Sequence, residues 1–270
     1  MAIFQSERGP LHYESLGMGR PIVLIHGFTN YGLSWAPQLS ALVHAGYRVI
    51  LPDLHGHGTS RPASRLCTVP DLATDIAALL DHLAEGPAIL CGLSLGGMVA
   101  MQMAIGQPDR VLGIVVANSR SSFCGPELSA MVDGWIALFC QDDGPVRRLR
   151  ATWPSLVNEA FGVSSTGRAV LDGWTRVLAG VSGASLCHVA QGMTRFDLRG
   201  RLAAVRAPAL VIGGEHDRLF SPDQAREIAG EIPGAAYAAI LGAGHLSNLD
   251  SADQFNRLFL DFLATHFPTA

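Results

Sequence analysis

The chain has 270 residues, of which 49% are hydrophobic and 16% are charged, and its formal net charge is −4. This composition excludes an intrinsically disordered chain and a general binder of nucleic acid or another polyanion. The sequence contains no apolar run of about 18 residues that would predict a transmembrane helix, and its first residues do not have the pattern of a signal peptide. We therefore expect a globular, cytoplasmic protein without a membrane or nucleic-acid partner, and a homo-oligomer stays open.

In chain order, the first elements alternate between two patterns. Short apolar runs at 21–25, 47–51, 87–91 and 111–116 are typical of strands buried on both faces of a parallel sheet. Apolar residues at helical spacing fall between them, from Trp35 to Val43 and from Leu72 to Leu83. Strands that alternate with helices predict an open α/β sheet.

The middle of the chain, residues 121–200, breaks this alternation. It has no run of Val and Ile, it contains Trp135, Trp153 and Trp174, and its apolar spacing is helical. We expect a helical insertion that packs over one end of the sheet. The remaining residues, 1–120 and 201–270, would then form one core domain.

The last region resumes the first pattern. Residues 209–213 and 236–241 are predicted strands. Ser221, followed by Pro222 and then Gln224, predicts a helix start with a capping box. The apolar spacing from Phe255 to Leu263 predicts a terminal helix that packs on the sheet.

Two residue types limit the chemistry. Every one of the 19 Lys and Arg residues is arginine, so chemistry that needs a lysine amine, such as a Schiff base or a Walker A lysine, is excluded. The cysteines are odd in number and contain no C-x-x-C pair, which favours reduced thiols over disulfides or a zinc ribbon. They are Cys67, Cys91, Cys124, Cys140 and Cys187. We expect no cofactor.

A candidate nucleophile stands between a predicted strand and a predicted helix. Residues 92–96 form a G-x-S-x-G motif centred on Ser94, directly after the strand at 87–91 and before a helical stretch from Gly97 to Ile105. Glycines on both sides allow the sharp turn that exposes the serine hydroxyl at the edge of the sheet. The alternative is a glycine-rich turn with an idle serine.

A serine hydroxyl needs a base, and the base needs an acid that orients it. His245 follows the last predicted strand on a glycine-rich loop, and Asp217 follows the strand at 209–213. Both therefore fall at the carboxyl ends of strands, where open α/β sheets form their sites. Glu215 is the rival acid. The backbone N–H groups of Phe28 and Leu95 are the predicted donors to the oxyanion, and His26 is interpreted as a residue that orders the loop.

Together these motifs resemble the α/β-hydrolase superfamily. They are His26-Gly27-Phe28, residues 53–60 (DLHGHGTS), residues 92–97 (GLSLGG), Glu215-His216-Asp217 and Gly244-His245. The resemblance implies a mostly parallel, eight-stranded sheet flanked by helices, with a helical cap after the sixth strand. His55 and His57 have the spacing of a metal-ligand pair, but they fit this family's His-Gly-x-Gly loop, so we expect no metal.

Within the superfamily, three segments resemble the 3-oxoadipate enol-lactonases: Ala117-Asn118-Ser119, residues 196–199 (FDLR) and residues 245–249 (HLSNL). The expected function is a serine hydrolase that cleaves an ester, lactone or enol-lactone bond by a Ser-His-Asp triad through an acyl-enzyme. Carbon–carbon bond hydrolysis, a general carboxylesterase, a perhydrolase and a hydroxynitrile lyase stay open, as does a non-catalytic binding protein with this fold.

The cap is expected to choose the substrate. The candidate substrate-binding residues are Trp135, Phe139, Trp153, Trp174, Phe123 and Leu246. The alternative for the cap aromatics is that they only fill the core of the cap, since aromatic residues at helical spacing usually do so. Met98 and His188 are further candidates for the cavity.

Overall fold

The computed structural model describes residues 2–60 and 62–268, and the described strands form one eight-stranded sheet. Its spatial order is β1-β2-β4-β3-β5-β6-β7-β8, in which β1, β2 and β4 pair antiparallel and all later neighbours pair parallel. The strands are β1 (Ala2–Ser6), β2 (Gly9–Leu16), β3 (Arg20–Ile25), β4 (Tyr47–Pro52), β5 (Ala88–Leu93), β6 (Val111–Ala117), β7 (Ala209–Gly214) and β8 (Ala236–Ile240). The predicted fold class is confirmed.

Six of these strands coincide with predicted apolar runs, and two do not. β1 and β2 form an antiparallel hairpin at the edge of the sheet. Only alternate residues of β2, Leu11 and Tyr13, are buried, so the hairpin lacks the continuous apolar run of an inner strand. The sequence pattern of β2 is a short alternation of buried and partly exposed residues, which is weaker than a continuous apolar run, so the hairpin was not predicted.

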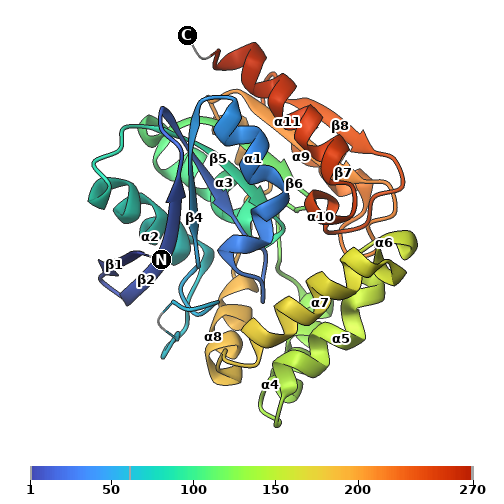
Figure 1. Ribbon diagram of the computed structural model, residues 1–270. Helices are drawn as coiled ribbons and strands as arrows, with labels where there is room; N and C mark the ends of the chain where they lie inside the picture. Colours follow the sequence, from blue (N-terminus) through green and yellow to red (C-terminus); the bar gives the residue numbers. More distant parts are fainter. Residues whose placement is uncertain (1, 61, 269–270) are drawn as a thin grey trace.

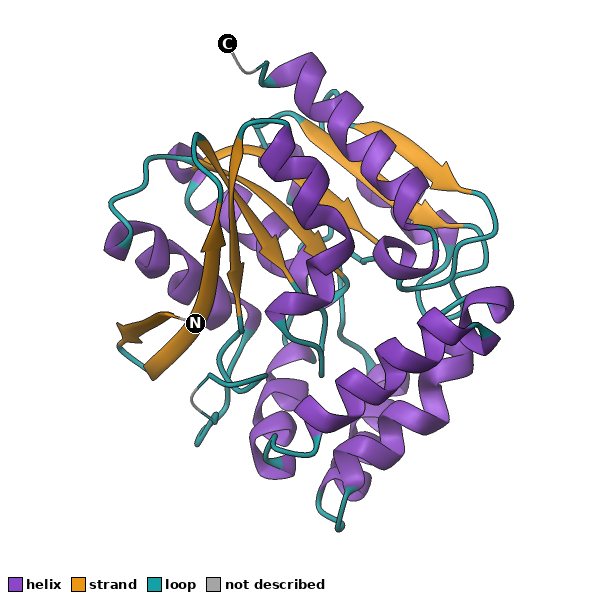
Figure 2. Ribbon diagram, in the orientation of Figure 1, coloured by secondary structure: helices purple, strands orange, loops and turns teal. Residues whose placement is uncertain are grey.

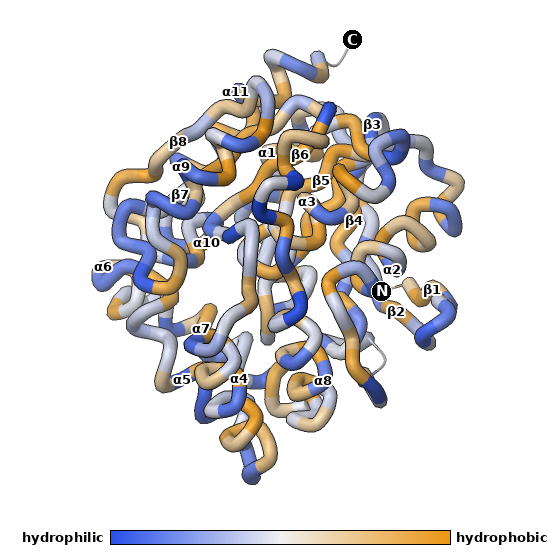
Figure 3. The backbone as a smooth tube through the Cα atoms, turned by 180° about the vertical axis from the view of Figure 1, so that it is seen from behind, coloured by the Kyte–Doolittle hydropathy of each residue, from blue (hydrophilic) through white to orange (hydrophobic). Residues whose placement is uncertain are grey.

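Helices cover both faces of the sheet (Figures 1 and 2). One face packs against α1 (Ala36–His44) and α11 (Ala252–His266). The other packs against α2 (Val69–His82), α3 (Leu95–Gly106) and α9 (Pro222–Glu231). The hydrophobic stretches follow the central strands and α3 in Figure 3, as burial on both faces of a parallel sheet requires.

Two helices begin at capping boxes, and the one at the start of α9 was predicted from the sequence. α9 begins after Ser221, whose side chain and that of Gln224 form the predicted capping box. α2 begins after Thr68, which forms a second capping box with Asp71. Shorter helical segments are α10 (Ser247–Asp250) and three 3-10 helices at Gly32–Trp35, Pro108–Arg110 and Leu202–Ala204.

The segment between β6 and β7 forms the helical cap. Its helices are α4 (Pro126–Phe139), α5 (Gly144–Leu156), α6 (Glu159–Val163), α7 (Ser165–Leu178) and α8 (Gly183–Met193). The two ends of the segment meet in an antiparallel bridge between Ser122 and Asp197. In Figure 2 the cap lies across the end of the sheet at which the parallel strands finish.

Hydrogen bonds attach the cap to the core at several places, among them the loops that follow β3 and β4. Trp174 on α7 donates its indole N–H to the carbonyl of Thr29 at 2.8 Å. Ser185 on α8 donates to the carbonyl of Gly56 and accepts from the N–H of Ala63. The cap therefore has a defined position over the loops that follow β3 and β4. No helix in the described part of the chain is long and apolar enough to span a membrane.

Candidate active site

Ser94 lies in the tight turn between β5 and α3. Its backbone has φ 57° and ψ −116°, a conformation that is strained for a residue with a side chain. A Cβ atom on Gly92 would lie 2.0 Å from the carbonyl oxygen of Gly96, and one on Gly96 would lie 2.0 Å from that of Ile25. The turn therefore requires glycine at both flanking positions of the motif, and it places Ser94 at the carboxyl edge of the sheet.

His245 and Asp217 meet beside this turn, although 28 residues separate them in the sequence. The Nδ1 atom of His245 lies 2.8 Å from Oδ2 of Asp217, and both side chains are buried. This contact fixes Nδ1 as the protonated nitrogen and leaves Nε2 free to accept a proton. Ser94 and His245 line the same cavity. The structure thus brings together the three side chains that the sequence selected.

The Asp217 carboxylate is held from several directions. Its Oδ1 accepts hydrogen bonds from the N–H groups of Leu219 and Phe220, at 2.8 and 2.9 Å. Its Oδ2 also accepts one from the Asn118 amide at 3.0 Å. Burial alone would raise the pKa of Asp217, but the charge on His245 and the hydrogen bonds hold that pKa below its ordinary value. The carboxylate is therefore ionised at neutral pH.

The rival acid, Glu215, lies elsewhere. Its side chain is exposed, and its Oε2 accepts a hydrogen bond from the N–H of Gly242 at 2.9 Å. It supports the loop before His245 and does not contact the imidazole through any hydrogen bond described here. Asp217 is the acid that the geometry selects.

Asn118 is a positioning residue whose role sequence reasoning missed. It follows β6 in the left-handed conformation, with φ 46°. Its amide nitrogen donates to Asp217 and to the carbonyl of Gly244, while its oxygen accepts from the Ser247 hydroxyl at 2.5 Å. One side chain thus links the loops that carry the acid and the base. Its place directly after β6 was the available signal.

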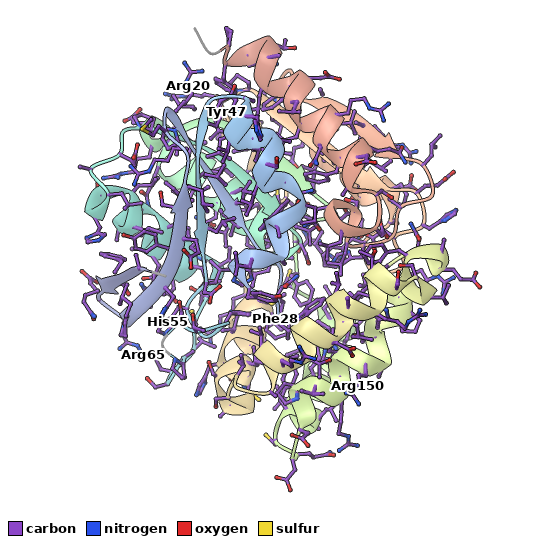
Figure 4. The ribbon with its side chains drawn as sticks, in the orientation of Figure 1. Arg20, Phe28, Tyr47, His55, Arg65 and Arg150 are labelled. Carbon is purple, nitrogen blue, oxygen red and sulfur yellow. The ribbon has the colours of Figure 1, made fainter. Side chains whose placement is uncertain are left out.

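The two predicted oxyanion donors lie on different segments of the core. Leu95 is the first residue of α3, where a backbone N–H has no earlier carbonyl of the helix to bind. Phe28 follows β3 and lines the cavity. Figure 4 shows Phe28 at the junction between the core and the cap.

His26 orders the loop that carries Phe28. Its Nδ1 lies 2.8 Å from the carbonyl of Gly27, and its Nε2 accepts a hydrogen bond from the N–H of Leu54 at 2.9 Å. Burial lowers the pKa of His26 to about 4, so the ring is neutral at pH 7. Both nitrogens are engaged, which is the structural role that the sequence favours.

A cavity of about 100 Å³ lies above Ser94 and between the core and the cap. Four of the six predicted substrate-binding residues line it: Phe123, Trp135, Trp174 and Leu246. The other two, Phe139 and Trp153, are not among the described residues that line it. Phe139 packs behind Phe28, with ring centroids 6.0 Å apart, and Trp153 packs on Trp174 at 6.3 Å. They support lining residues instead, since Phe139 packs on Phe28 and Trp153 on Trp174.

The two remaining cavity candidates also lie outside the lining. Met98 is fully buried in the core, and His188 is half-buried on α8, where its carbonyl accepts from the N–H of Cys67. Sequence reasoning missed two lining residues that carry charge, Arg120 and Arg148. Nothing in their local pattern separates them from the other arginines.

The described residues contain no cluster of three or more His, Cys, Asp or Glu side chains that could hold a metal ion. His55 and His57 are buried in the loop after β4. Burial lowers the pKa of His57 to about 3, and its Nδ1 lies 3.2 Å from the carbonyl of His55. This loop packs His57 against His26 and Phe28, with ring centroids 5.2 and 5.6 Å apart.

This fold and this arrangement of side chains define a hydrolase of the α/β class. Residues 22–258 match the alpha/beta hydrolase family, and the chain belongs to that family. The resemblance identified from the sequence motifs is therefore confirmed, and so is the prediction of an enzyme with this fold.

Individual relatives differ in the reaction that their names describe. A Variovorax paradoxus protein, provisionally named a carbamate hydrolase, is 31% identical over 94% of this chain and 96% of its own length. The enol-lactonase structure from Burkholderia xenovorans LB400 has a TM-score of 0.90 at 28% identity, covering 97% of this chain and all of that one. A thermophilic esterase from Thermogutta terrifontis has a TM-score of 0.89 at 27% identity and covers 98% of both chains.

Proposed function

We propose that this chain is a serine hydrolase that cleaves a small ester or lactone through an acyl-enzyme on Ser94. The observation that carries the proposal is that Ser94, on its strained turn, lines one small cavity with a His245 that Asp217 orients. The similarity to an esterase and to an enol-lactonase supports the choice of bond.

The reaction begins at the serine hydroxyl. Ser94 Oγ attacks the substrate carbonyl while His245 Nε2 accepts the hydroxyl proton. The resulting imidazolium is stabilised by the Asp217 carboxylate, 2.8 Å from Nδ1. The backbone N–H groups of Phe28 and Leu95 bind the oxyanion of the tetrahedral intermediate.

The intermediate then collapses to the acyl-enzyme. The carbon–oxygen bond to the leaving group breaks, and His245 returns its proton to the departing oxygen, which in a lactone stays tethered to the acyl group. A water molecule, deprotonated by His245, attacks the acyl carbon. The bond to Ser94 Oγ then breaks while His245 returns the proton to that oxygen, which releases the carboxylic acid and restores the serine hydroxyl.

A covalent probe tests the nucleophile without knowledge of the natural substrate. A fluorophosphonate should phosphonylate wild-type protein at Ser94 with loss of fluoride, and peptide mass spectrometry should locate the adduct. Ser94→Ala should abolish labelling and lower kcat by about 10⁴- to 10⁶-fold. Ser129→Ala, an exposed serine on α4, is the matched control that should keep both.

The bond type is tested by a substrate panel with Ser94→Ala as the blank. It contains aryl esters, lactones, enol-lactones, dienones and a carbamate. Turnover confined to the esters and lactones supports the proposal. Turnover of the dienones alone would reassign the enzyme to carbon–carbon bond hydrolysis, and an unlabelled, inactive protein would point to a binding role.

A further inference from the structure

Two of the five cysteines lie close together in the cap. Cys140 is the residue at which α4 ends, and Cys187 lies within α8. These two helices lie side by side (Figures 1 and 3). A Cβ atom on Gly183, at the start of α8, would lie 2.0 Å from the carbonyl oxygen of Phe139. The two backbones therefore approach each other closely one residue before Cys140 and one helical turn before Cys187.

Hydrogen bonds bring the two thiols to one place. The Cys187 thiol donates to the carbonyl of Ile136 on α4, with 4.0 Å between sulfur and oxygen. The backbone N–H of Cys140 donates to the same carbonyl oxygen at 3.1 Å. A side-chain hydrogen bond also joins the Cys140 and Cys187 thiols. The two sulfur atoms are therefore neighbours across the contact between α4 and α8.

The two thiols differ in their access to solvent. Cys140 is exposed, so a dissolved oxidant can reach it. Cys187 is buried, and burial together with negative charge on Cys140 raises the pKa of Cys187 to about 11. Cys187 is therefore a protonated thiol at neutral pH. Because the thiolate is the nucleophile, the exposed Cys140 is the one that reacts first with an oxidant, and Cys187 follows.

The other three cysteines have different surroundings. Cys67, in the loop before α2, and Cys91, on β5, are buried in the core. Cys124 lies where the cap begins, and its sulfur lies 3.1 Å from the Ser122 hydroxyl and 3.4 Å from the Asp197 carboxylate. The contacts described for these sulfur atoms are with other residue types. Only Cys140 and Cys187, among the described residues, combine an exposed thiol with a second thiol in contact.

The two helices that carry this pair have different attachments. Trp135 on α4 lines the cavity and stacks on Phe28, with ring centroids 5.5 Å apart. Ser185 on α8 is hydrogen-bonded to Gly56 and Ala63 of the core. A covalent bond between α4 and α8 would therefore tie the aromatic wall of the cavity to the helix that the core holds.

We propose that Cys140 and Cys187 form a reversible disulfide that fastens α4 to α8 and keeps the cavity closed around short acyl groups. The bond itself is independent of the proposed function, whereas its effect on acyl groups rests on that function.

The oxidant is a small disulfide such as oxidised glutathione. The Cys140 thiolate attacks one of its sulfur atoms and releases one glutathione thiol, and deprotonated Cys187 then attacks the Cys140 sulfur and releases the second. The two protein thiols thus lose two electrons and two protons, which the two glutathione thiols gain. Because the mixed disulfide removes negative charge from Cys140, it also removes one cause of the raised pKa of Cys187.

Thiol titration and peptide mass spectrometry test the bond in the whole chain. Wild-type protein treated with oxidised glutathione should lose two reactive thiols, yield the Cys140 and Cys187 peptides as one linked pair, and regain both thiols in dithiothreitol. Cys124→Ser, at a partly exposed cysteine outside the pair, should behave in the same way. Cys187→Ser should instead keep one glutathione on Cys140. Wild-type protein that retains both thiols, stops at a glutathione adduct or forms a dimer linked through Cys140 would overturn the inference.

Kinetics with two esters test the effect on the cavity. The cavity of about 100 Å³ suits p-nitrophenyl acetate, whereas the longer chain of p-nitrophenyl octanoate requires the cap to move. We expect oxidation of the wild type to lower kcat/KM for the octanoate by about tenfold relative to the acetate, with no change of this ratio in Cys140→Ser. An unchanged ratio in oxidised wild type would overturn the closure of the cavity.

The two sets of measurements separate this inference from the proposed function. The Cys140–Cys187 bond in a protein that hydrolyses neither ester would retain the redox site and refute the hydrolase. Hydrolysis of both esters by a protein whose thiols do not form this bond would do the reverse.

Discussion

The core side and the cap side of the cavity are held by different kinds of contact. On the core side, Asp217 accepts hydrogen bonds from Leu219, Phe220 and Asn118 as well as contacting His245. On the cap side, Arg148 is positioned by the rings of Trp135 and Phe28, and its Nε has no partner.

This difference separates the chemistry from the selection of the substrate. In the proposed reaction, the groups that move a proton have fixed hydrogen-bond partners and tautomers before any ligand binds, which is what preorganised catalysis requires. Substitutions on the core side should therefore change kcat for every substrate, whereas those on the cap side should change the ratio between substrates.

The largest effect should come from Asp217, the proposed acid. Asp217→Asn removes the charge that would stabilise the imidazolium and fix the tautomer of His245, so kcat should fall by about 10⁴-fold for every substrate. Glu215→Gln is the matched control, because Glu215 is exposed and only accepts from Gly242. Steady-state kinetics would contradict the assignment if the Glu215 variant were the more impaired of the two.

The same comparison shows what a single sequence can predict. Ser94 directly follows β5, Asp217 and His245 lie in the loops after β7 and β8, and parallel strands bring their carboxyl ends to one edge. Local pattern and topology were therefore sufficient to predict that these residues gather at one edge of the sheet. The inner strands were predictable for a similar reason, since burial on both faces produces continuous apolar runs.

The cap side was less predictable. Helical spacing identifies the apolar face of a helix, but not the neighbour that the face packs against. Trp135 and Trp174 thus line the cavity while Phe139 and Trp153 pack behind them. Arg148 was missed because its lack of a partner depends on the packing of α4 and α5 against the Phe28 loop. No pattern in the sequence encodes that environment.

A second test uses pH and stability. The pKa of His26 is about 4 in the folded chain, below the ordinary value of about 6.5 for histidine, so the unfolded chain binds the proton more readily. The stabilisation is complete above about pH 6.5 and is lost as the pH falls towards 4, by roughly 3 kcal/mol.

His26→Gln should therefore flatten the loss of the unfolding free energy between pH 7 and pH 4.5, as measured by urea denaturation. Arg148→Met should keep the wild-type pH dependence, because Arg148 stays protonated throughout this range. An equally steep profile in the His26 variant would show that its buried ring does not contribute to acid sensitivity.

The smallest expected effect should come from a substitution at the contact between the core side and the cap side of the cavity. Asp250 Oδ2 accepts hydrogen bonds from Gly244, next to His245, and from Asn158 in the cap, both at 2.8 Å. The N–H of Leu246 also donates to the carbonyl of Leu156 at 2.8 Å. The loop that carries the base is thus fastened to the cap on both sides of His245.

Asp250→Ala leaves two N–H groups without their acceptor, so the free energy of unfolding should fall by about 1–3 kcal/mol and kcat by about fivefold. Asp250→Asn keeps one acceptor oxygen and should retain most of both, and Asp253→Ala, an exposed aspartate on α11, is the control. Urea denaturation and steady-state kinetics measure the outcome. If Asp250→Asn were as impaired as Asp250→Ala, the hydrogen bonds from Gly244 and Asn158 would not be what holds the loop.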